Sequence, residues 1–170
     1  TTRETNRAAI KWKAWIDAST PVPTPPTNPS LVGLFEGAHY HPTGWYRPKL
    51  NCLMRNFGVG FCEVCQEALV LAFYRQVRAI ESATPITTNL VVSSPESLNF
   101  SLNLVQPTVH ALSVQWLTNG TPVPQATNTS LSLPPAALGN GAHTVMGRVT
   151  DPTPLVRTDP SNTLSQTLTW

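Results

Sequence analysis

The chain has 170 residues, 41% hydrophobic and only 12% charged, with a formal net charge of +2. It can therefore bury a hydrophobic core, and the small charge gives no indication of nucleic acid as a partner. Its 17 prolines exceed the usual share of about 5% in globular chains and favour ordered loops and edge strands over a helical bundle. Because no apolar run approaches the roughly 18 residues of a membrane helix, no membrane partner is expected either.

The N-terminal segment is predicted to form a short helix over residues 7–16, anchored by Ile10, Trp12 and Trp15. The prolines at positions 21, 23, 25 and 26 then remove backbone donors and force an extended path. Two interpretations of residues 19–26 stay open, a semi-rigid strap across the surface and a proline-rich recognition segment.

A longer helix is predicted over residues 63–81. Leu69, Phe73, Val77 and Ile80 are spaced to share one face of that helix, and the acidic Glu63 opens its first turn. This spacing predicts an element that packs against the core.

The remaining residues alternate between apolar and polar side chains in short runs. Turn residues separate these runs, for example Asn119-Gly120 and Gly139-Asn140-Gly141. Period-two segments at this spacing predict an antiparallel β-sandwich. Its inward-facing residues are expected to be Phe100, Leu102, Leu104, Leu112, Val114, Trp116, Leu131, Leu133, Val145, Gly147, Val149, Leu164, Leu168 and Trp170.

The character of the chain changes near residues 82–90, because all the cysteines precede this stretch and the alternating runs follow it. We therefore predict two domains, residues 1–84 and 85–170. The expected fold class is an α+β unit with one main helix, followed by an all-β sandwich.

Three cysteines, Cys52, Cys62 and Cys65, are compatible with three kinds of site. A disulfide fits an exported chain, although the odd number leaves one thiol free or paired outside the chain. A structural zinc site would need a fourth ligand, which His39 or His41 could supply. A dithiol redox site is the third option, since Cys62 and Cys65 precede a predicted helix.

Polar and aromatic residues between positions 36 and 47 include standard acid-base and metal-binding groups. The candidates for lining a substrate cleft are Glu36, His39, Tyr40, Tyr46 and Arg47. The alternative is that these side chains pack a loop against the core. No nucleophile motif, P-loop or dinucleotide fingerprint occurs in the sequence. None of the four histidines has a second histidine four residues later, so the sequence contains no His-Glu-x-x-His zinc helix. No residue is therefore assigned as catalytic.

Three blocks of sequence follow one another in the first half of the chain. They are Gly33-Leu34-Phe35-Glu36-Gly37-Ala38-x-Tyr40, then Gly44-x-Tyr46-Arg47-Pro48-x-x-x-Cys52-x-Met54-Arg55, then Phe61-Cys62-x-Val64-Cys65-x-Glu67-Ala68. This order of blocks resembles the C-terminal half of the catalytic domain in secreted bacterial zinc metallopeptidases of the immunoglobulin A peptidase family. The resemblance covers roughly residues 1–82.

The resemblance implies a metzincin-like C-terminal catalytic subdomain, with the zinc-binding helix located upstream and an Ig-like domain following. It also implies that Met54 belongs to a methionine turn beneath the metal, although an ordinary buried methionine is an equal alternative. Zinc would be the cofactor of the intact parent enzyme, and no metal is expected in this chain alone.

The sequence thus predicts a proteolytic fragment of an exported bacterial zinc metallopeptidase that is inactive alone. Its partners would be the missing N-terminal part of the catalytic domain or a second copy of itself, and a protein substrate in the parent. Thr1 in place of methionine and the low charge agree with a processed, secreted product. The alternative is a non-catalytic extracellular protein that binds or self-assembles through its Ig-like domain.

Overall fold

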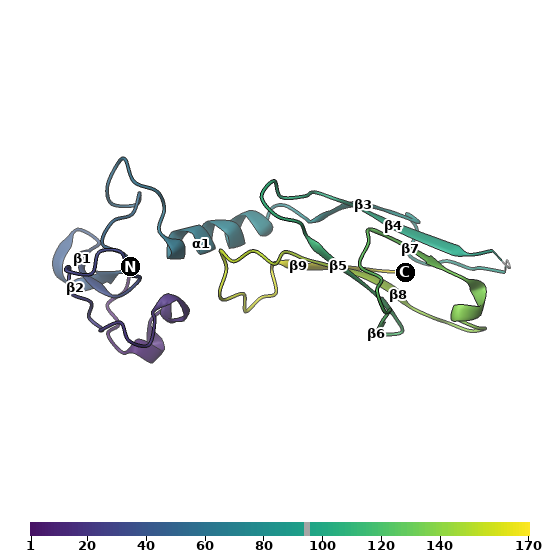
Figure 1. The fold of residues 1–170 in the computed structure, drawn as a ribbon, viewed down its shortest axis with the longest axis horizontal. Coiled ribbons are helices and arrows are strands. Elements are labelled where there is room, and N and C mark those ends of the chain that lie inside the picture. The colour runs from purple at the N-terminus through teal and green to yellow at the C-terminus, as the bar shows by residue number, and fades with distance from the viewer. Residues whose placement is uncertain (94–95) are drawn as a thin grey trace. The chain divides into compact units, whose positions relative to one another are not determined.

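The computed structural model describes residues 1–93 and 96–170 and divides them into two compact units. Unit 1 comprises Thr1–Ala72 with Pro154–Thr158, and unit 2 comprises Phe73–Thr153 with Asp159–Trp170. The described residues form mainly β-sheet with one α-helix, which agrees with the predicted α+β class (Figure 1). In the described residues, no helix is long and apolar enough to cross a membrane.

Unit 1 has little regular structure at its N-terminus. The predicted helix over residues 7–16 is wrong, because this segment forms two separate 3₁₀ turns, η1 (Arg7–Ala9) and η2 (Lys13–Trp15). The predicted anchors still serve, since Ile10 and Trp12 are buried together with Ile16 and Leu34, and Trp15 packs against them. Each three-residue turn forms hydrogen bonds within its own backbone, and the buried apolar side chains determine the course of the chain between the turns.

The proline-rich segment is fixed to the next part of the chain by Thr24. The Thr24 N–H donates to Leu34 O at 2.8 Å, and the Leu34 N–H donates to Thr24 Oγ1 at 2.8 Å. The buried indole of Trp12 donates to Gly33 O at 2.8 Å. These bonds hold the segment against unit 1, which favours the strap over the recognition segment.

A hairpin follows the strap. Strand β1 (Phe35–Ala38) pairs with β2 (His41–Arg47) in antiparallel register, with Phe35 opposite Arg47 and Glu36 opposite Tyr46. His39 and Tyr40 form the turn with φ of 52° and 63°, the left-handed conformation that a tight two-residue hairpin turn requires.

Helix α1 (Glu63–Tyr74) is shorter than predicted. The expected continuation to Glu81 is wrong, because Ile80 pairs with Leu104 in the adjoining sheet and begins β3 (Ile80–Thr84). The expected core-packing role is also wrong for the described structure, since α1 has no buried residue and Phe73 is 65% exposed. Helical spacing of apolar residues alone does not distinguish a helix face that packs in the core from one that is exposed in the structure.

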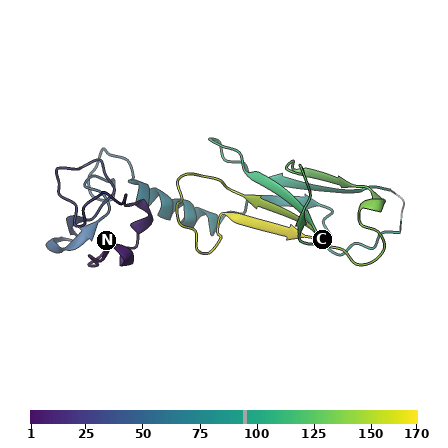
Figure 2. The same cartoon turned by 60° about the horizontal axis from the view of Figure 1, so that its bottom comes forward.

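Unit 2 contains two antiparallel sheets, visible from two directions in Figures 1 and 2. One sheet has the order β3-β4-β7 and the other β6-β5-β8-β9. The strands after β3 are β4 (Leu98–Leu104), β5 (Ser113–Thr118), β6 (Thr121–Pro122), β7 (Ser130–Leu133), β8 (Val145–Thr150) and β9 (Ser165–Thr169), with the short turn η3 (Pro135–Ala137) after β7.

The two sheets of unit 2 share one hydrophobic core, and the predicted alternation of β4, β5, β7 and β8 is confirmed. Trp116 is fully buried, with its ring 5.8 Å from that of Trp170 and 6.1 Å from that of Phe100. Of the predicted inward-facing residues, those buried in this core are Phe100, Leu102, Leu112, Val114, Trp116, Leu131, Leu133, Val145, Val149 and Trp170. The β5–β6 turn has positive φ at Asn119 and Gly120, as the sequence predicted for a hairpin.

The close approach of the strap to β1 gives a stability test for unit 1. A Cβ added at Gly33 would lie 2.2 Å from Thr24 Oγ1, and Thr24 is buried and hydrogen-bonded on both sides. We expect Gly33→Ala to destabilise unit 1 by about 1–3 kcal/mol, as overpacking typically does. Urea unfolding and amide exchange of residues 24 and 34 measure this loss.

Gly60→Ala is the matched control, because its added Cβ meets no atom within 4 Å and its backbone has no positive φ. That variant should keep or slightly raise the stability of unit 1. Equal stability of the two variants would contradict the proposed contact between Gly33 and Thr24.

Candidate functional site

The three cysteines come together at the N-terminal end of α1. Cys52 lies in the loop after the hairpin, Cys62 directly precedes the helix, and Cys65 is in its first turn. Their sulfur atoms all lie within 4.8 Å of one another, and Cys52 Sγ is 3.7 Å from Cys65 Sγ. Cys52 and Cys62 are buried, so this cluster is largely shielded from solvent.

The backbone closes a loop between the first two cysteines. Leu53 N donates to Gly60 O at 3.0 Å, and Arg55 N and Asn56 N donate to Cys52 O at 2.8 and 2.9 Å. The Cys62 N–H donates to Cys52 Sγ at 3.2 Å. This arrangement holds the Cys52 sulfur against the start of α1 without a covalent bond.

The three thiols differ in acidity. Burial raises the pKa of Cys52, whereas hydrogen bonds from the N–H groups of Cys62 and Met54 lower it. The hydrogen bonds have the larger combined effect, so the pKa of Cys52 lies below the usual value. Burial raises the pKa of Cys62, and burial with repulsion by Cys62 raises the pKa of Cys65 to about 12. The pKa values of the three thiols are thus unequal, and that of Cys52 is the lowest.

The positions of the cysteines bear on two of the three kinds of site that the sequence left open, the disulfide and the zinc site with a histidine ligand. The three cysteines are free thiols in the structure, so the predicted disulfide is not shown. The cluster of possible metal ligands contains the three cysteines alone among the described His, Cys, Asp and Glu side chains, so His39 and His41 do not complete it. The spacing of the cysteines indicated a shared site, but the sequence did not show that Cys52 would reach it.

The other candidate residues lie on the β1–β2 hairpin. Glu36 Oε1 accepts a hydrogen bond from Gly44 N at 2.9 Å, and the Arg47 guanidinium donates to Glu36 O at 3.0 Å. Burial and repulsion by Arg55 lower the pKa of Arg47, and its Nε atom is buried without a hydrogen-bond partner. Tyr46 packs against the core of unit 1.

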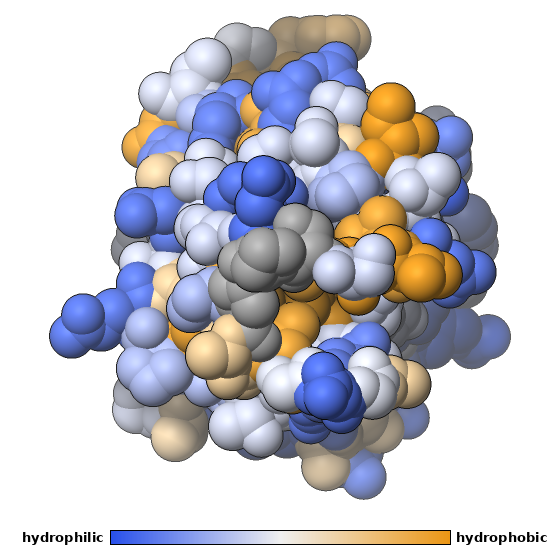
Figure 3. Space-filling view, turned by 90° about the vertical axis from the view of Figure 1, so that its right-hand side faces the viewer, coloured by the Kyte–Doolittle hydropathy of each residue, from blue (hydrophilic) through white to orange (hydrophobic). Residues whose placement is uncertain are grey.

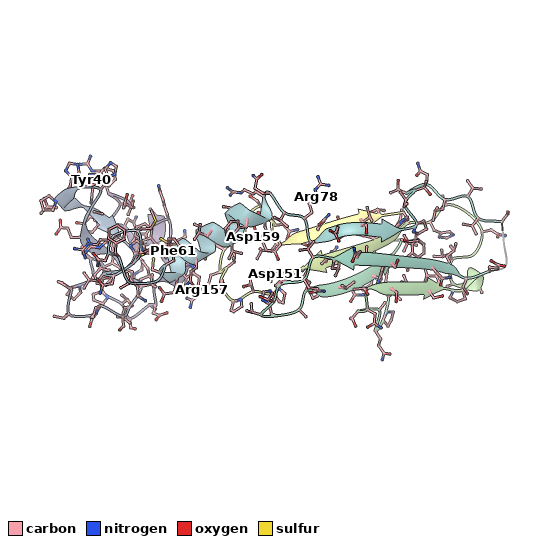
Figure 4. The ribbon with its side chains drawn as sticks, turned by 90° about the horizontal axis from the view of Figure 1, so that it is seen from above. Tyr40, Phe61, Arg78, Asp151, Arg157 and Asp159 are labelled. Carbon is pink, nitrogen blue, oxygen red and sulfur yellow. The ribbon has the colours of Figure 1, made fainter. Side chains whose placement is uncertain are left out.

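The turn of this hairpin presents aromatic side chains to solvent. Tyr40 is fully exposed and is labelled in Figure 4. The ring of His39 lies 4.6 Å from that of Trp45 and 6.2 Å from that of His41, while the Arg3 guanidinium lies 5.8 Å from the Trp45 ring. The turn of the hairpin therefore carries an exposed surface of aromatic rings, whereas Tyr46 packs against the core of unit 1 as the alternative predicted.

Met54 is 75% exposed in the described structure. It is therefore not an ordinary buried methionine, which was one of its two interpretations. The methionine-turn interpretation concerns a metal site outside the described residues and stays a prediction.

The sequence analysis did not predict two polar clusters that the structure contains. In unit 1, Glu67 Oε2 accepts hydrogen bonds from the Trp15 indole N–H and from Arg157 N, the latter at 3.1 Å. The Arg157 guanidinium lies 4.2 Å from the Trp15 ring centroid and donates to Ala14 O at 3.1 Å. Residues 15, 67 and 157 are far apart in the sequence, so no local pattern indicated this contact.

The second cluster lies in unit 2 around Asp151, labelled in Figure 4. The carboxylate accepts from the Tyr74 hydroxyl, lies 2.5 Å from His110 Nε2 and accepts from Thr153 N at 2.8 Å. Burial and the neighbouring carboxylate raise the pKa of Tyr74. A buried carboxylate with these partners is a satisfied structural network.

Unit 2 also contains a groove of about 780 Å³. Its lining includes Leu90, Leu98, Phe100, Leu138 and Trp170. Figure 3 shows apolar side chains gathered on a face of the molecule, and Val91 and Val92 are among the exposed apolar residues of this unit. The groove thus offers an apolar surface that is separate from the thiol cluster in the sequence.

Comparison with known families assigns part of unit 1. The family model described as IgA Peptidase M64 matches residues 26–73. The match contains the hairpin and all three cysteines and ends inside α1, so the chain is peptidase-related over this segment. Neither the curated proteins nor the solved structures gave a match.

The network around Asp151 gives a second stability test. Tyr74→Phe removes only the hydroxyl and leaves one oxygen of a buried carboxylate without its donor. We expect unit 2 to lose about 1–3 kcal/mol of stability in urea unfolding. Tyr40→Phe, the same change on a fully exposed side chain, should leave the midpoint unchanged. Identical midpoints for both variants would refute a stabilising role for the Tyr74 hydroxyl.

Proposed function

We propose that this chain contains the C-terminal part of the catalytic domain of an exported bacterial zinc metallopeptidase, followed by an Ig-like domain. The observation that carries the proposal is the match of the M64 peptidase family to residues 26–73. The match contains all three sequence blocks and extends from before the hairpin to the last turn of α1. Within the parent enzyme this segment would form a floor and wall of the substrate cleft.

The strand order of unit 2 supports the Ig-like part. Three strands, β3, β4 and β7, form one sheet, and β6, β5, β8 and β9 form the other, so the chain changes sheets after β4, β6 and β7 as in a Greek key. Trp116 lies in β5, an inner strand, and is fully buried in the shared core. A buried tryptophan at this place is typical of Ig-like sandwiches.

The cleft role rests on the hairpin residues Glu36, His39, Tyr40, Tyr46 and Arg47. His39 and Tyr40 are exposed at the turn, and Arg47 keeps a buried guanidinium Nε without a protein partner. Arg47 also donates to Glu36 O within the hairpin, so its role would be to hold the hairpin in shape. The hairpin edge would accept the backbone of an extended peptide substrate.

The residues of this chain do not fit the catalytic zinc of the parent. The described residues contain one group of possible metal ligands, and it is made of thiols rather than histidines. The zinc ligands and the general base would come from the proposed N-terminal part of the domain. In the parent the zinc would polarise the scissile carbonyl, and residues 1–170 are not expected to hydrolyse peptides alone.

Exposed apolar side chains in unit 1 support a missing partner surface. Met54, Phe57 and Phe61 are 75%, 99% and 36% exposed, and no residue of α1 is buried. Soluble proteins rarely leave so many large apolar groups in water unless another surface covers them. We propose that the N-terminal part of the catalytic domain covers this set.

The alternative function is binding or self-assembly through unit 2. The apolar groove lined by Leu90, Leu98 and Trp170 favours it. In that case residues 1–170 would associate with a protein or with a second copy in the absence of any peptidase component.

The two functions differ in what accompanies the chain in native material. We expect intact mass and metal analysis of native material to find a His-Glu-x-x-His segment, on a longer chain or on a second polypeptide, and peptidase activity that residues 1–170 lack alone. Phe57→Asp should weaken this association at least tenfold, because it places a charge in the buried contact. Ile86→Asp changes an exposed residue of unit 2 and should have no effect. Native material with residues 1–170 as its only polypeptide would reject the peptidase proposal.

A further inference from the structure

The three cysteine sulfur atoms gather at the start of α1. The Sγ atoms of Cys52, Cys62 and Cys65 lie within 4.8 Å of one another, and two of the three side chains are buried. The ligand atoms converge from a loop and from the first turn of a twelve-residue helix. Cysteine sulfur is among the ligands that zinc binds in proteins, and three of them are brought together here.

The separation of the sulfurs distinguishes these two cases. Cys52 Sγ and Cys65 Sγ are 3.7 Å apart. A disulfide requires about 2.05 Å between sulfurs. Two thiolates on one tetrahedral zinc, each with a bond of about 2.3 Å, lie about 3.8 Å apart. The observed separation is too long for a disulfide and is compatible with two ligands of one ion, and in the structure the two thiols form a hydrogen bond at this distance.

The backbone around the cluster is already arranged for thiolates. The Cys62 N–H points at Cys52 Sγ at 3.2 Å, and the 52–62 loop is closed by the bond from Leu53 N to Gly60 O. The Lys49 ammonium lies 2.5 Å from Glu63 Oε1 beside the cluster, so a cation neutralises the acidic residue that follows Cys62. Hydrogen bonds to sulfur lower the cost of collecting negative charge at a metal site.

We propose that Cys52, Cys62 and Cys65 bind one zinc ion through three thiolates, with the fourth position taken by water or another external ligand. Soft thiolate ligands in the Cys-x-x-Cys spacing favour zinc over magnesium, calcium or manganese. Each thiol that binds releases its proton to solvent. Because its ligands come from the 52–62 loop and from the start of α1, the ion would fix the loop of Met54 and Phe57 to that helix.

This site is distinct from the catalytic zinc of the proposed parent, because it uses thiols of this chain and needs no histidine. The sequence offered His39 or His41 as the fourth ligand. Both lie on the β1–β2 hairpin, and neither belongs to the ligand group formed by the cysteines. The proposal therefore holds or fails independently of peptidase activity.

The test uses the full chain of 170 residues, purified with a reductant and without chelator. We expect about one zinc per chain by elemental analysis, and three thiols that react with a thiol reagent only after a chelator removes the metal. Titration of the metal-free chain with Co²⁺ should give thiolate-to-cobalt charge transfer and the visible bands of a tetrahedral site. Absence of these bands, with zinc below a tenth of an equivalent, overturns the proposal.

Variants identify the ligands. Cys52→Ser and Cys65→Ser should each lose stoichiometric zinc, whereas the double variant His39→Ala with His41→Ala should retain it. Retention of one zinc by Cys52→Ser would overturn the proposal, as would loss of zinc in the histidine double variant. A native mass two hydrogens below that of the reduced chain, without zinc, would identify a disulfide instead. If a cysteine variant fails to fold, the cobalt spectrum and thiol count of the unmodified chain still decide.

Discussion

The indole N–H groups of tryptophan fix the irregular segments on which this structure depends. Four of the five tryptophans donate to a segment that is distant in the sequence. Trp12 and Trp116 donate to Gly33 O and Asn128 O, each at 2.8 Å, Trp170 donates to Pro85 O at 2.8 Å, and Trp15 donates to Glu67. A chain with many prolines has fewer backbone donors, so side-chain donors satisfy carbonyls that a helix or sheet would otherwise pair.

This constraint explains why unit 1 is ordered despite its short elements. Its core consists of a few large side chains, and Gly33 brings the strap close enough for Thr24 to bond Leu34 in both directions. The hairpin follows directly from Leu34, and the cysteine loop follows the hairpin. The positions of both candidate sites thus depend on the same contact between strap and β1.

The sequence predicted unit 2 better than unit 1 for a physical reason. Alternation along β4, β5 and β8 reports directly which side chains face the shared core, because every second residue of a strand points the same way. The helical spacing of Leu69, Phe73, Val77 and Ile80 led to the wrong prediction of one helix over residues 63–81. The first two residues lie on α1, but Ile80 pairs with Leu104 in a sheet. Strand pairing is a long-range contact that a local period cannot reveal.

The site was predictable only in its residue types. Cys62-x-x-Cys65 before a helix indicated shared chemistry, but the distance from Cys52 depends on a loop closed by Leu53 and Gly60. The Asp151 network joins residues 74, 110 and 151, which no motif connects.

Two independent boundaries then agree. The family match ends at residue 73, and unit 1 passes into unit 2 between Ala72 and Phe73. The first comes from sequence similarity and the second from contacts within the fold, and unit 1 additionally contains Pro154–Thr158. Met54, Phe57, Phe61 and the thiol cluster lie within the matched residues. A metal at the cluster would hold the loop of Met54 and Phe57 in one conformation. It would thereby present those exposed side chains as a rigid surface to whatever covers α1.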